Sequence, residues 1–553
     1  MNALKDIMTP WQRLIGLLRL EKKAVKQVIY YAIFSGLLAL TLPLGIQAII
    51  NLIQGAQVST SWIVLVVLVT LGVSFVGVLQ LMQLRIIETI QQRIFTRASF
   101  EFTYRFPKIK MQELRNYYPP ELANRFFDTL TIQKGLAKIL VDVPSAVLQI
   151  IFALILLSFY HPFFIAFGIL LLMLIYVVFK YTARRGMDTS LKESKHKYRV
   201  AHWIQEVART VVSFKLSGKT SLALNKNDEL VYDYLQARES HFKILVIQFI
   251  QMIGFKVLVT AGLLIIGGLL VLSQEMNIGQ FVAAEIIILL VINSVEKLIL
   301  GLESFYDVLT SLEKMGQVVD KSLENQEGNT LDFETDFKLE LKKVNYEVPN
   351  RELSILSNIN IDINDKSRIM IQGESGSGKS TLLRLISGII EPTYGSVFVN
   401  DININSMNLN HYRSNLGLSL ADETPFEGTI RDNITFGNTQ ISDNDVMKAV
   451  KNVGLSQFIK ESPNGLDTML YPEGKQASFT VSKKIVLARA IVKEPKLLIL
   501  EDPLEHFEVK ETKKIIDFLC DSSNDWALVV VSVNDLWKSK CTQIVTLKEG
   551  KIV

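Results

Sequence analysis

The sequence predicts two domains of different class: an α-helical six-span transmembrane domain, followed by an α/β domain of the P-loop nucleotide-binding type. Three observations predict this arrangement. The chain has 553 residues, which is too long for a single hydrophobic core. Hydrophobic residues make up 49% of it and are concentrated in the first part of the chain. A phosphate-binding motif of the form G-x-x-x-x-G-K-[ST] begins at Gly373.

The charge and cysteine content narrow the class of protein. Lysine and arginine number 59 against 55 aspartate and glutamate, so the net charge of +4 indicates no nucleic-acid partner. The two cysteines, Cys520 and Cys541, are too few for a disulfide framework, and we expect a reducing, cytosolic environment for that part. The N-terminus has no short apolar core followed by a small-residue cleavage site, so we expect no cleaved signal peptide.

Residues 1–25 predict a helix that lies on the membrane surface. Basic and apolar side chains are interspersed there, a pattern that suits an anionic membrane face and its lipids. An ordinary amphipathic surface helix is the alternative. The basic residues are Lys5, Arg13, Arg19, Lys22 and Lys23, and the apolar ones are Trp11, Leu14, Ile15, Leu17 and Leu18.

Residues 26–320 predict the transmembrane domain. Six runs are apolar and long enough to cross a bilayer, and the second carries no charge at all. Buried helices of a soluble protein are the alternative, but that pattern would have to recur for every run. The candidate spans are 28–53, 62–84, 139–159, 161–181, 244–273 and 278–300.

The distribution of basic residues predicts the orientation of these spans. Lysines and arginines follow the second and fourth spans, beginning at Arg85 and Lys180, whereas the short connections after the first, third and fifth spans hold none. Because loops rich in lysine and arginine stay on the cytosolic side, both termini are expected in the cytosol. We expect a multi-pass protein of a bacterial inner membrane.

Two long cytosolic segments, 85–138 and 182–243, are predicted to continue the spans as helices beyond the membrane. Each contains a break in which a short crosswise helix fits, at 117–122 and at 215–219. We expect these two breaks to contact the nucleotide-binding domain.

Some ionisable residues lie inside the apolar runs, where charges are costly and tend to face a cavity or a partner. Lys256 and Glu296 lie at similar depths, about 24 and 25 Å below the outer ends of their spans at ~1.5 Å rise per residue. We therefore predict that they pair; the alternative is that both side chains reach the inner interface. Glu285, nearer the outer face, either lines an exit path or reaches water.

Residues 321–336 are polar and lack periodicity, so they predict a linker between the two domains. The nucleotide-binding domain is then expected to occupy residues 337–553. Strand-like segments surround the phosphate-binding motif at 338–344, 359–363, 367–371 and 397–399.

The phosphate-binding motif predicts a site for ATP and Mg²⁺. A predicted strand leads into it and a helix leads out, whose positive N-terminal end favours an anion. The lysine is expected to reach the outer phosphates and the Ser380 hydroxyl to hold magnesium. A Gly/Ser-rich surface loop is the alternative. The residues predicted to bind the nucleotide here are Gly373, Glu374, Ser375, Gly376, Ser377, Gly378, Lys379, Ser380 and Thr381.

A second acidic element is expected near that motif. A basic helix at 481–492 leads to an apolar strand at 496–500, which ends in Glu501 and Asp502. Carboxylates at the C-terminal end of such a strand are placed to hold magnesium and to activate water. We predict that Glu501 binds Mg²⁺ and that Asp502 is a weak general base.

The order of spans, cytosolic segments, linker and phosphate loop resembles an ABC exporter half-transporter, in which one membrane domain is fused to one ATP-binding cassette. The resemblance covers nearly the whole chain, and its first span looks like that of type I secretion and peptide exporters. It implies a dimer in which each ATP site joins the phosphate loop of one cassette to the signature segment of the other. The supporting motifs are Pro392-Thr393-Tyr394-Gly395-Ser396, Gly428-Thr429-Ile430-Arg431-Asp432-Asn433-Ile434, Leu487-Ala488-Arg489-Ala490 and Gly550-Lys551-Ile552-Val553.

The signature segment departs from the family pattern. Counted back from Leu487, the family's LSGGQ falls on 477–481, where Ser478 remains as a predicted nucleotide contact. Phe479 and Thr480 replace glycines whose backbone approaches the γ-phosphate, and a side chain there should hold the phosphate off.

Other positions of the family's hydrolytic machinery also depart. The acidic pair is inverted to Glu501-Asp502, so the base is one methylene short, and a misplacement of about 1 Å can cost ~100-fold in rate. Ala421 and Val533 stand where the family has glutamine and histidine. Val348 takes the position of the aromatic residue that stacks on adenine, and Tyr346 is predicted to substitute for it.

Two functions from different classes follow from this pattern. The first is an ATP-binding subunit of an exporter that moves substrate, with peptide or protein as one candidate class, outward with slow or partner-dependent hydrolysis. The second is a pseudo-transporter that uses ATP binding without turnover as a structural or regulatory switch. The expected partner is a second half-transporter, in a homodimer or a heterodimer, with a periplasmic adaptor as a further candidate.

Overall fold

The structure is a computed structural model that describes residues 8–55, 60–330, 337–349 and 351–553; the side chains of 178, 179, 182 and 183 are also outside the description. The N-terminal Lys5 and residues 331–336 of the predicted linker therefore lie outside the described residues. Two compact units are present. The helical unit runs up to Pro107 and from Asn116 to Lys321, and the cassette unit comprises Lys108–Arg115 and Ser322–Val553.

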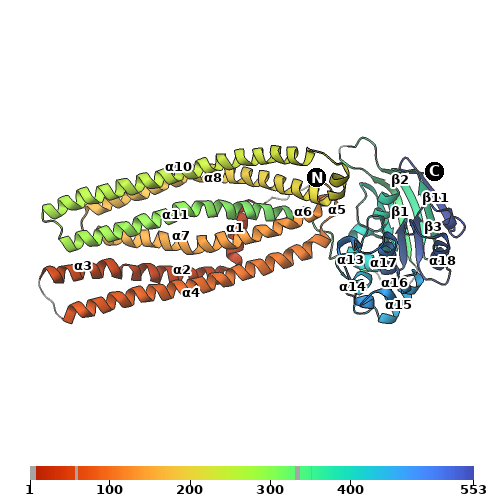
Figure 1. The fold of residues 1–553 in the computed structure, drawn as a ribbon, viewed down its shortest axis with the longest axis horizontal. Helices are drawn as coiled ribbons and strands as arrows, with labels where there is room; N and C mark the ends of the chain where they lie inside the picture. Colours follow the sequence, from red (N-terminus) through yellow and green to blue (C-terminus); the bar gives the residue numbers. More distant parts are fainter. Residues whose placement is uncertain (1–7, 56–59, 331–336, 350) are drawn as a thin grey trace. The chain divides into compact units, whose positions relative to one another are not determined.

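The helical unit is built from long helices that run side by side (Figure 1). The longest, α10, has 51 residues, and at ~1.5 Å rise per residue it is about 76 Å long, more than twice the ~30 Å hydrocarbon core of a bilayer. The helices are α1 (Pro10–Leu20), α2 (Lys22–Ala39), α3 (Thr41–Gln54), α4 (Thr60–Arg105), α6 (Pro119–Ala123), α7 (Asp128–Ser158), α8 (Phe163–Arg209), α9 (Val211–Leu216), α10 (Leu222–Leu272) and α11 (Ile278–Val319).

Each predicted span that lies within the described residues is helical. The first is divided between α2 and α3, and the others coincide with parts of α4, α7, α8, α10 and α11 to within two residues at their ends. Among the described residues, five helices are long and apolar enough to cross a membrane, and the described apolar part of α8, Phe163–Val177, is shorter. The two long segments predicted to be cytosolic continue α4, α8 and α10 without interruption at the predicted membrane border.

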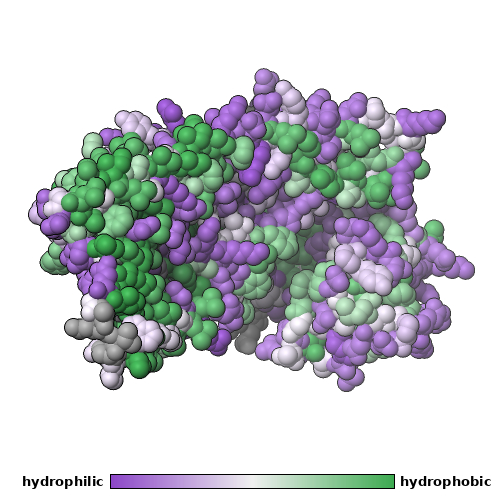
Figure 2. Space-filling view, turned by 60° about the vertical axis from the view of Figure 1, so that its left-hand side comes forward, coloured by the Kyte–Doolittle hydropathy of each residue, from purple (hydrophilic) through white to green (hydrophobic). Residues whose placement is uncertain are grey.

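The surface of the helical unit is apolar over broad areas. Large hydrophobic side chains of α4 point outward, including Leu68, Leu71 and Phe75, each about half exposed. Figure 2 shows hydrophobic areas gathered on the side of the molecule that comes forward in that view. Contiguous apolar surface of this kind is rare on soluble proteins, whereas lipid covers it without cost.

Helix α11 carries the most enclosed face of the helical unit. Its small residues Ala283 and Ala284 are fully buried, and they bring α11 close to its neighbours. Tyr306 of α11 lies against Gly186 of α8, where an added Cβ would be 2.4 Å from the tyrosine ring. Tyr306 also accepts a hydrogen bond from Gln248 of α10 at 3.0 Å. These contacts tie three long helices together.

The predicted ion pair between Lys256 and Glu296 is confirmed. The Lys256 Nζ of α10 lies 2.6 Å from the Glu296 Oε2 of α11. A charge within an apolar run is tolerated when it is paired, and the hydrogen bond contributes to that compensation. Glu285 is half-buried, and its two proposed roles stay predictions.

Helix α1 is a short amphipathic helix at the start of the described chain. Thr9 caps it, Pro10 occupies the first helical position, and Gln12 completes the capping box. Leu14 is buried, and Arg13 bonds Asp320 just past the end of α11. One face of α1 therefore packs on its own unit, while its placement on a membrane surface stays a prediction.

The crosswise helices form close to the predicted breaks. The short helix α6 overlaps the predicted break at 117–122, and the short helix α9 ends within the predicted break at 215–219. Helix α6 begins with a proline pair, which suits the first turn of a helix, and it belongs to the helical unit. The stretch of the first cytosolic segment that belongs to the cassette unit is Lys108–Arg115, with α5 (Met111–Leu114). The expected contacts of the two breaks with the cassette stay predictions.

The described residues of the cassette unit form three sheets. A four-stranded antiparallel sheet has the order β2-β1-β4-β5, a six-stranded sheet has the order β12-β11-β3-β10-β9-β6, and β7 pairs with β8. The strands are β1 (Lys338–Tyr346), β2 (Leu356–Asn364), β3 (Arg368–Gly373), β4 (Tyr394–Val399), β5 (Ile402–Asn403), β6 (Leu416–Ser419), β7 (Gly428–Thr429), β8 (Met469–Leu470), β9 (Leu497–Glu501), β10 (Ala527–Val531), β11 (Gln543–Lys548) and β12 (Lys551–Ile552).

Helices pack on the six-stranded sheet, among them α12 and α17, and further helices pack on these. The helices of this unit that follow the phosphate loop are α12 (Lys379–Ile386), α13 (Leu409–Ser414), α14 (Ile430–Thr435), α15 (Asp443–Asn452), α16 (Ser456–Glu461), α17 (Phe479–Ile491) and α18 (Val509–Leu519). The central strands are buried on both faces: in β9, Leu497 and Ile499 join one hydrophobic cluster, and Leu498 and Leu500 join another. This alternation follows from the two-residue period of a strand, and burial of both faces is typical of parallel sheets.

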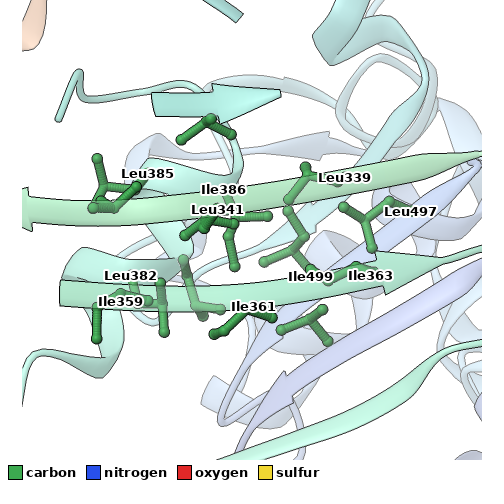
Figure 3. Packing of buried hydrophobic residues seen from close by; sticks show 14 of the residues in the cluster. Leu339, Leu341, Ile359, Ile361, Ile363, Leu382, Leu385, Ile386, Leu497 and Ile499 are labelled. Atoms are coloured by element: carbon green, nitrogen blue, oxygen red, sulfur yellow. The ribbon is translucent and has the colours of Figure 1, made fainter. Parts of the chain in front are cut away.

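The first hydrophobic cluster holds α12 in place. Figure 3 shows Leu382, Leu385 and Ile386 of α12 among side chains of β1, β2 and β9. These three side chains are 0–1% exposed. The helix that follows the phosphate loop is therefore fixed by the core on which the two larger sheets converge.

The predicted linker is ordered in its described part. Glu324 is buried and its carboxylate binds the Arg413 guanidinium through two hydrogen bonds, 2.6 and 3.0 Å long. Asn329 forms a β-bridge with Met407, and an added Cβ on Gly328 would be 2.1 Å from the Met407 carbonyl carbon. Residues 322–330 thus belong to the fold of the cassette unit, since polar contacts, invisible to hydrophobic periodicity, hold them there.

Candidate nucleotide site

The order of the parallel strands brings four loops to one edge of the six-stranded sheet. The strands β3, β10, β9 and β6 are neighbours and run in the same direction, so their C-terminal ends lie together. Ligands of open α/β sheets bind at this edge. The phosphate loop follows β3, Val533 lies beyond β10, Glu501 ends β9, and Ala421 lies beyond β6. Residues far apart in the sequence are therefore brought to one site.

The glycines of the phosphate loop allow its backbone to curve. Gly376 and Gly378 have φ values of 83° and 102°, which other residues rarely adopt. An added Cβ on Gly378 would also lie 2.7 Å from the Leu356 Cδ2 and 2.9 Å from the Ile355 oxygen. Gly378 precedes α12 and offers no side-chain cap. The first N–H groups of α12 are therefore available to an anion.

Two polar groups of the loop fit a phosphate. The Lys379 Nζ donates to the carbonyl oxygens of Gly373 and Glu374, both at 2.8 Å, so the ammonium lies over the loop. The Ser377 hydroxyl is buried and has no hydrogen-bond partner within the described residues. A buried donor without a partner is costly, and an oxyanion held in the loop would satisfy it.

Ser380 and Glu501 form a pair suited to magnesium. The Ser380 hydroxyl donates to the Glu501 Oε1, and the Ala421 N–H donates to Oε2 at 3.3 Å. Glu501 is 7% exposed. Within the described ranges, no group of three or more His, Cys, Asp or Glu side chains is arranged to hold a metal. A hydroxyl and one carboxylate match the few protein ligands that Mg²⁺ takes beside substrate phosphates.

Asp502 is held in an unusual conformation. Its φ is 42°, in a region that costs energy for a residue with a side chain. Burial raises the pKa of the Asp502 carboxyl, while hydrogen bonds from the Val533 N–H and the Ser532 hydroxyl oppose that rise. Asp502 is thus placed at the sheet edge, as predicted, but its carboxylate is already bonded by its own chain. Its role as a general base stays a prediction.

The signature segment forms the N-terminus of α17. Ser478 is the N-cap, and its Oγ accepts a hydrogen bond from the Val481 N–H at 3.3 Å and lies 3.1 Å from the Thr480 Oγ1. Phe479 is 49% exposed and packs edge-on against His506. The Ser478 hydroxyl is therefore bonded locally, and a bulky ring stands where the family has no side chain.

A buried lysine joins the signature helix to the edge of the sheet. Lys483 is 5% exposed, and its Nζ donates to the Ala421 carbonyl oxygen at 2.7 Å. The same Nζ lies 5.7 Å from the centre of the Phe479 ring. Sequence reasoning missed Lys483. The available signal was its position on α17, four residues after Phe479 and so on the same face.

The Tyr346 side chain is largely buried. It is 7% exposed, belongs to the hydrophobic cluster around α12, and its hydroxyl accepts a hydrogen bond from the Arg115 Nη2 at 2.8 Å. The stacking role of Tyr346 on adenine stays a prediction. Val348 is half-buried in the same region.

Arg115 comes from the segment Lys108–Arg115, which belongs to the cassette unit. Ile109 of this segment forms a β-bridge with Leu323, and the Lys110 Nζ lies 2.7 Å from the Glu391 Oε1. A stretch of the first segment predicted to be cytosolic is therefore bonded to the fold that carries the phosphate loop. Neither Arg115 nor Lys110 was singled out from the sequence as a contact of the cassette.

Comparisons with known proteins agree with this architecture. The ABC transporter transmembrane region matches residues 28–295, and the ABC transporter cassette matches residues 356–505. Together the two matches cover most of the chain. Apolar helices and a phosphate-loop domain in one polypeptide define a membrane-bound P-loop protein. The chain belongs to the ABC transporter family.

Individual relatives are similar over only part of their length. An ATP-dependent permease, MDL1, of Candida albicans is 29% identical over 49% of this chain and 40% of its own. The leukotoxin export ATP-binding protein LtxB of Aggregatibacter actinomycetemcomitans is 26% identical over 56% of this chain and 45% of its own. The matched region spans less than two thirds of these relatives.

A solved structure shares the whole fold. A bacterial Atm1-family ABC exporter with ATP bound superposes with a TM-score of 0.84 over 97% of this chain and 95% of that one, at 16% identity. The fold is that of an exporter-type half-transporter, a class that typically works as a dimer. The chain is accordingly a multi-pass membrane protein with a cassette of the ATP-binding type.

Proposed function

We propose that this protein is the ATP-binding subunit of an exporter that moves substrate outward across a bacterial inner membrane, with both termini in the cytosol and slow or partner-dependent hydrolysis. The observation that carries the proposal is the contact of Ser380 with Glu501 beside an uncapped helix end and a loop lysine. These groups match the charges of a magnesium nucleotide, with cations and N–H groups for phosphates and oxygens for the metal.

The residues of this chain divide the binding work among them. The N–H groups at the start of α12 and the Ser377 hydroxyl take phosphate oxygens, and Lys379 exchanges its loop carbonyls for them. Ser380 and Glu501 would hold Mg²⁺, which supplies charge neutralisation to the phosphates when bound. Glu501 is already oriented by the Ala421 N–H, so little rearrangement is needed.

Slow turnover follows from the signature segment and from Asp502. The Ser478 hydroxyl caps its own helix, and Phe479 occupies the approach to it. Asp502, the general base we propose, is short and bonded by the backbone beyond β10. In a dimer the phosphate loop of one chain faces the signature segment of the other, so a homodimer would contain two such sites. A second half-transporter with intact signature glycines would supply one better site.

Binding and turnover have to be measured separately. The full-length protein, purified in detergent, is titrated with fluorescent ATP in the presence of Mg²⁺, and phosphate release is followed alone and with any cassette subunit that co-purifies. Saturable ATP binding with measurable turnover is the expected result. Absence of saturable binding would refute the proposal.

The alternative function is a switch that binds ATP without turnover. Two contacts favour it. The Ser478 hydroxyl of the signature segment already accepts a hydrogen bond from its own helix, and the Ala421 carbonyl oxygen at the edge of the sheet already accepts one from Lys483. Saturable binding with no phosphate release, alone or with a partner cassette, would establish the switch in place of the exporter.

A further inference from the structure

The two cysteines of the chain lie side by side in the cassette unit. Cys520 is the C-cap of α18, and Cys541 lies just before β11. Both are half-buried and pack against the same hydrophobic cluster, and a hydrogen bond joins their thiol groups. The sequence contains only these two cysteines, so any thiol chemistry of the protein belongs to this pair.

Contacts between the two segments keep the thiols together. The Lys540 Nζ lies 2.7 Å from the Asp517 Oδ1, which joins the residue before Cys541 to the last turn of α18. The Cys541 N–H donates to the carbonyl oxygen of the buried Trp537 at 2.9 Å. Because a disulfide forms only between cysteines whose side chains already face each other, this arrangement is the one that a bond between the two sulfur atoms requires.

A buried arginine lies beside both cysteines. Arg368 begins β3 and is 6% exposed. Its Nη2 donates to the carbonyl oxygen of Asp521, the residue after Cys520, at 3.4 Å. Its own carbonyl oxygen accepts a hydrogen bond at 2.8 Å from the N–H of Thr542, the residue after Cys541. The guanidinium is therefore close enough to both thiols for their charges to act on it.

The Arg368 guanidinium has no anionic partner. It donates to the carbonyl oxygens of Trp526, Asn524 and Asp521, and among the described residues it forms no ion pair. Its Nε is buried and has no hydrogen-bond partner in the described part of the chain. A buried cation without a counter-charge is costly, and a thiolate beside it would supply that charge.

The surroundings of the two thiols differ. The hydrogen bond from the Cys520 thiol lowers the pKa of Cys541, and the Arg368 charge acts in the same direction against burial. The same hydrogen bond and burial raise the pKa of Cys520. Since the thiolate is the reactive form, Cys541 is suited to attack and Cys520 to react second.

We infer that Cys541 and Cys520 form a redox-active dithiol that closes reversibly to a disulfide by exchange with a small-molecule disulfide such as oxidised glutathione. The inference does not depend on the proposed export function. Both cysteines are half-buried, and Thr542 and Gln543 beside Cys541 are exposed, so a small reagent can reach the pair. Cytosolic disulfides of ordinary proteins are usually transient and catalytic or redox-sensing.

The exchange takes place in two steps. The Cys541 thiolate attacks one sulfur of the small disulfide, whose S–S bond breaks and releases one thiolate. Cys520 then gives its proton to that thiolate and attacks the Cys541 sulfur, which releases the second thiolate. The second thiolate takes up the proton that Cys541 lost on ionisation. Two protein thiols are thereby oxidised to one disulfide, and the small disulfide is reduced to two thiols.

The disulfide would restrain a segment that reaches the nucleotide site. It would close a loop of about 22 residues, which contains β10 together with Ser532 and Val533, the two residues that bond the Asp502 carboxyl. The cysteines themselves lie near Arg368, at the start of β3, whereas the phosphate loop follows the end of that strand. The dithiol is therefore separate from the groups that bind phosphate.

The test uses the full-length protein in detergent, equilibrated with glutathione buffers of increasing oxidised fraction. Free thiols are then blocked with iodoacetamide, and the cysteine peptides are identified by mass spectrometry. We expect both thiols to disappear together into a bond within one chain, and dithiothreitol to restore them. The apparent Tm of the oxidised protein should exceed that of the reduced protein by roughly 5 °C, because the cross-link restricts the unfolded chain.

Three results would overturn the inference. The first is the absence of a disulfide in the most oxidising buffer. The second is a disulfide that joins two chains, seen as a dimer on a non-reducing gel. The third is an oxidised protein whose Tm is equal to or lower than that of the reduced one, since the native fold would then not hold the sulfur atoms in bonding geometry.

Single substitutions test which thiol attacks. In Cys520→Ser, the remaining Cys541 should form a mixed disulfide with glutathione about tenfold faster than Cys520 does in Cys541→Ser. The same variants unfolded in urea are the matched control and should react at similar rates, because Arg368 no longer lies beside the thiols. Equal rates in the folded variants, or a difference that persists in urea, would overturn the assignment of Cys541 as the attacking thiol.

ATP affinity, measured on each variant, reports whether the cassette is folded. Saturable ATP binding without a disulfide within the chain would overturn this inference alone and leave the proposed function standing. A disulfide within the chain in a protein that binds no ATP would refute the proposed function alone.

Discussion

Two helix N-termini of the cassette unit, those of α12 and α17, have opposite local chemistry. At α12 the preceding residue is Gly378, which offers no side-chain cap and leaves the first N–H groups open. At α17 the N-cap Ser478 accepts a hydrogen bond from the Val481 N–H, and the Phe479 side chain at the first position of the helix is exposed. The first terminus is built to receive an anion and the second is already capped. Nucleotide binding and nucleotide turnover can therefore change independently in this fold.

The largest expected effect tests the open terminus. Lys379→Ala removes the only ammonium that bonds the loop carbonyls among the described contacts. Because a charge-assisted hydrogen bond to phosphate is lost, we expect ATP affinity to fall by about 100-fold. Titration with fluorescent ATP measures it. Lys366→Ala, an exposed lysine before β3, is the control and should bind as the unmodified protein does. Equal affinities would break the comparison.

The second prediction opens the capped terminus. The double substitution Phe479→Gly with Thr480→Gly removes both side chains from the start of α17, and we expect phosphate release to rise about tenfold as backbone N–H groups become accessible. Phe479→Leu with Thr480→Ser retains side chains and should leave turnover low. A rate that does not rise would show that the signature segment is not what limits hydrolysis.

The third prediction concerns the Glu501 carboxylate, which is bonded by Ser380 on one oxygen and by the Ala421 N–H on the other. Glu501→Gln keeps the Ser380 and Ala421 contacts sterically possible but removes the charge. We expect the stimulation of ATP binding by Mg²⁺ to fall roughly fivefold, because a hard cation prefers a carboxylate to an amide. Glu505→Gln, an exposed neighbour, should retain full stimulation. ATP titrations with and without Mg²⁺ decide between them.

The smallest expected effect concerns Asp502. Burial raises the pKa of its carboxyl, so the favourable contribution of the protonated group is present at low pH and is lost as the pH rises through the folded-state value. Asp502→Asn stays neutral throughout and should raise the apparent Tm by roughly 2 °C near pH 7.5. The gain should shrink as the pH is lowered and the Asp502 carboxyl becomes protonated, because both side chains are then uncharged. Thermal unfolding at neutral and at acidic pH measures it, and equal gains would show that burial of a charged carboxylate is not the cause.

Sequence periodicity predicted the regular elements well. Strands and helices around the phosphate loop fall within a few residues of their predicted positions, because burial of alternate residues in a strand leaves a clear pattern. The same approach placed Lys256 opposite Glu296, since depth along a helix follows from residue count alone.

What the sequence could not predict depends on contacts between distant segments. Tyr346 was expected to face a nucleotide, but Arg115, more than two hundred residues earlier, bonds its hydroxyl. The polar residues 322–330 gave no periodic signal, although they belong to the fold because the Glu324 carboxylate is hydrogen-bonded by Arg413. Periodicity identifies elements, whereas pairing partners are set by the tertiary fold.

The bonding of Glu324 to Arg413 decides where an independent cassette fragment has to begin. A fragment that starts at the first strand would keep Arg413 but lack Glu324, so both hydrogen bonds to the Glu324 carboxylate would be lost. The largely buried Arg413 guanidinium would then have no counter-charge from Glu324. Such a fragment should be less stable and more prone to aggregation than one that starts at Ser322. Soluble expression of the nucleotide-binding portion therefore depends on a peptide that precedes its first strand.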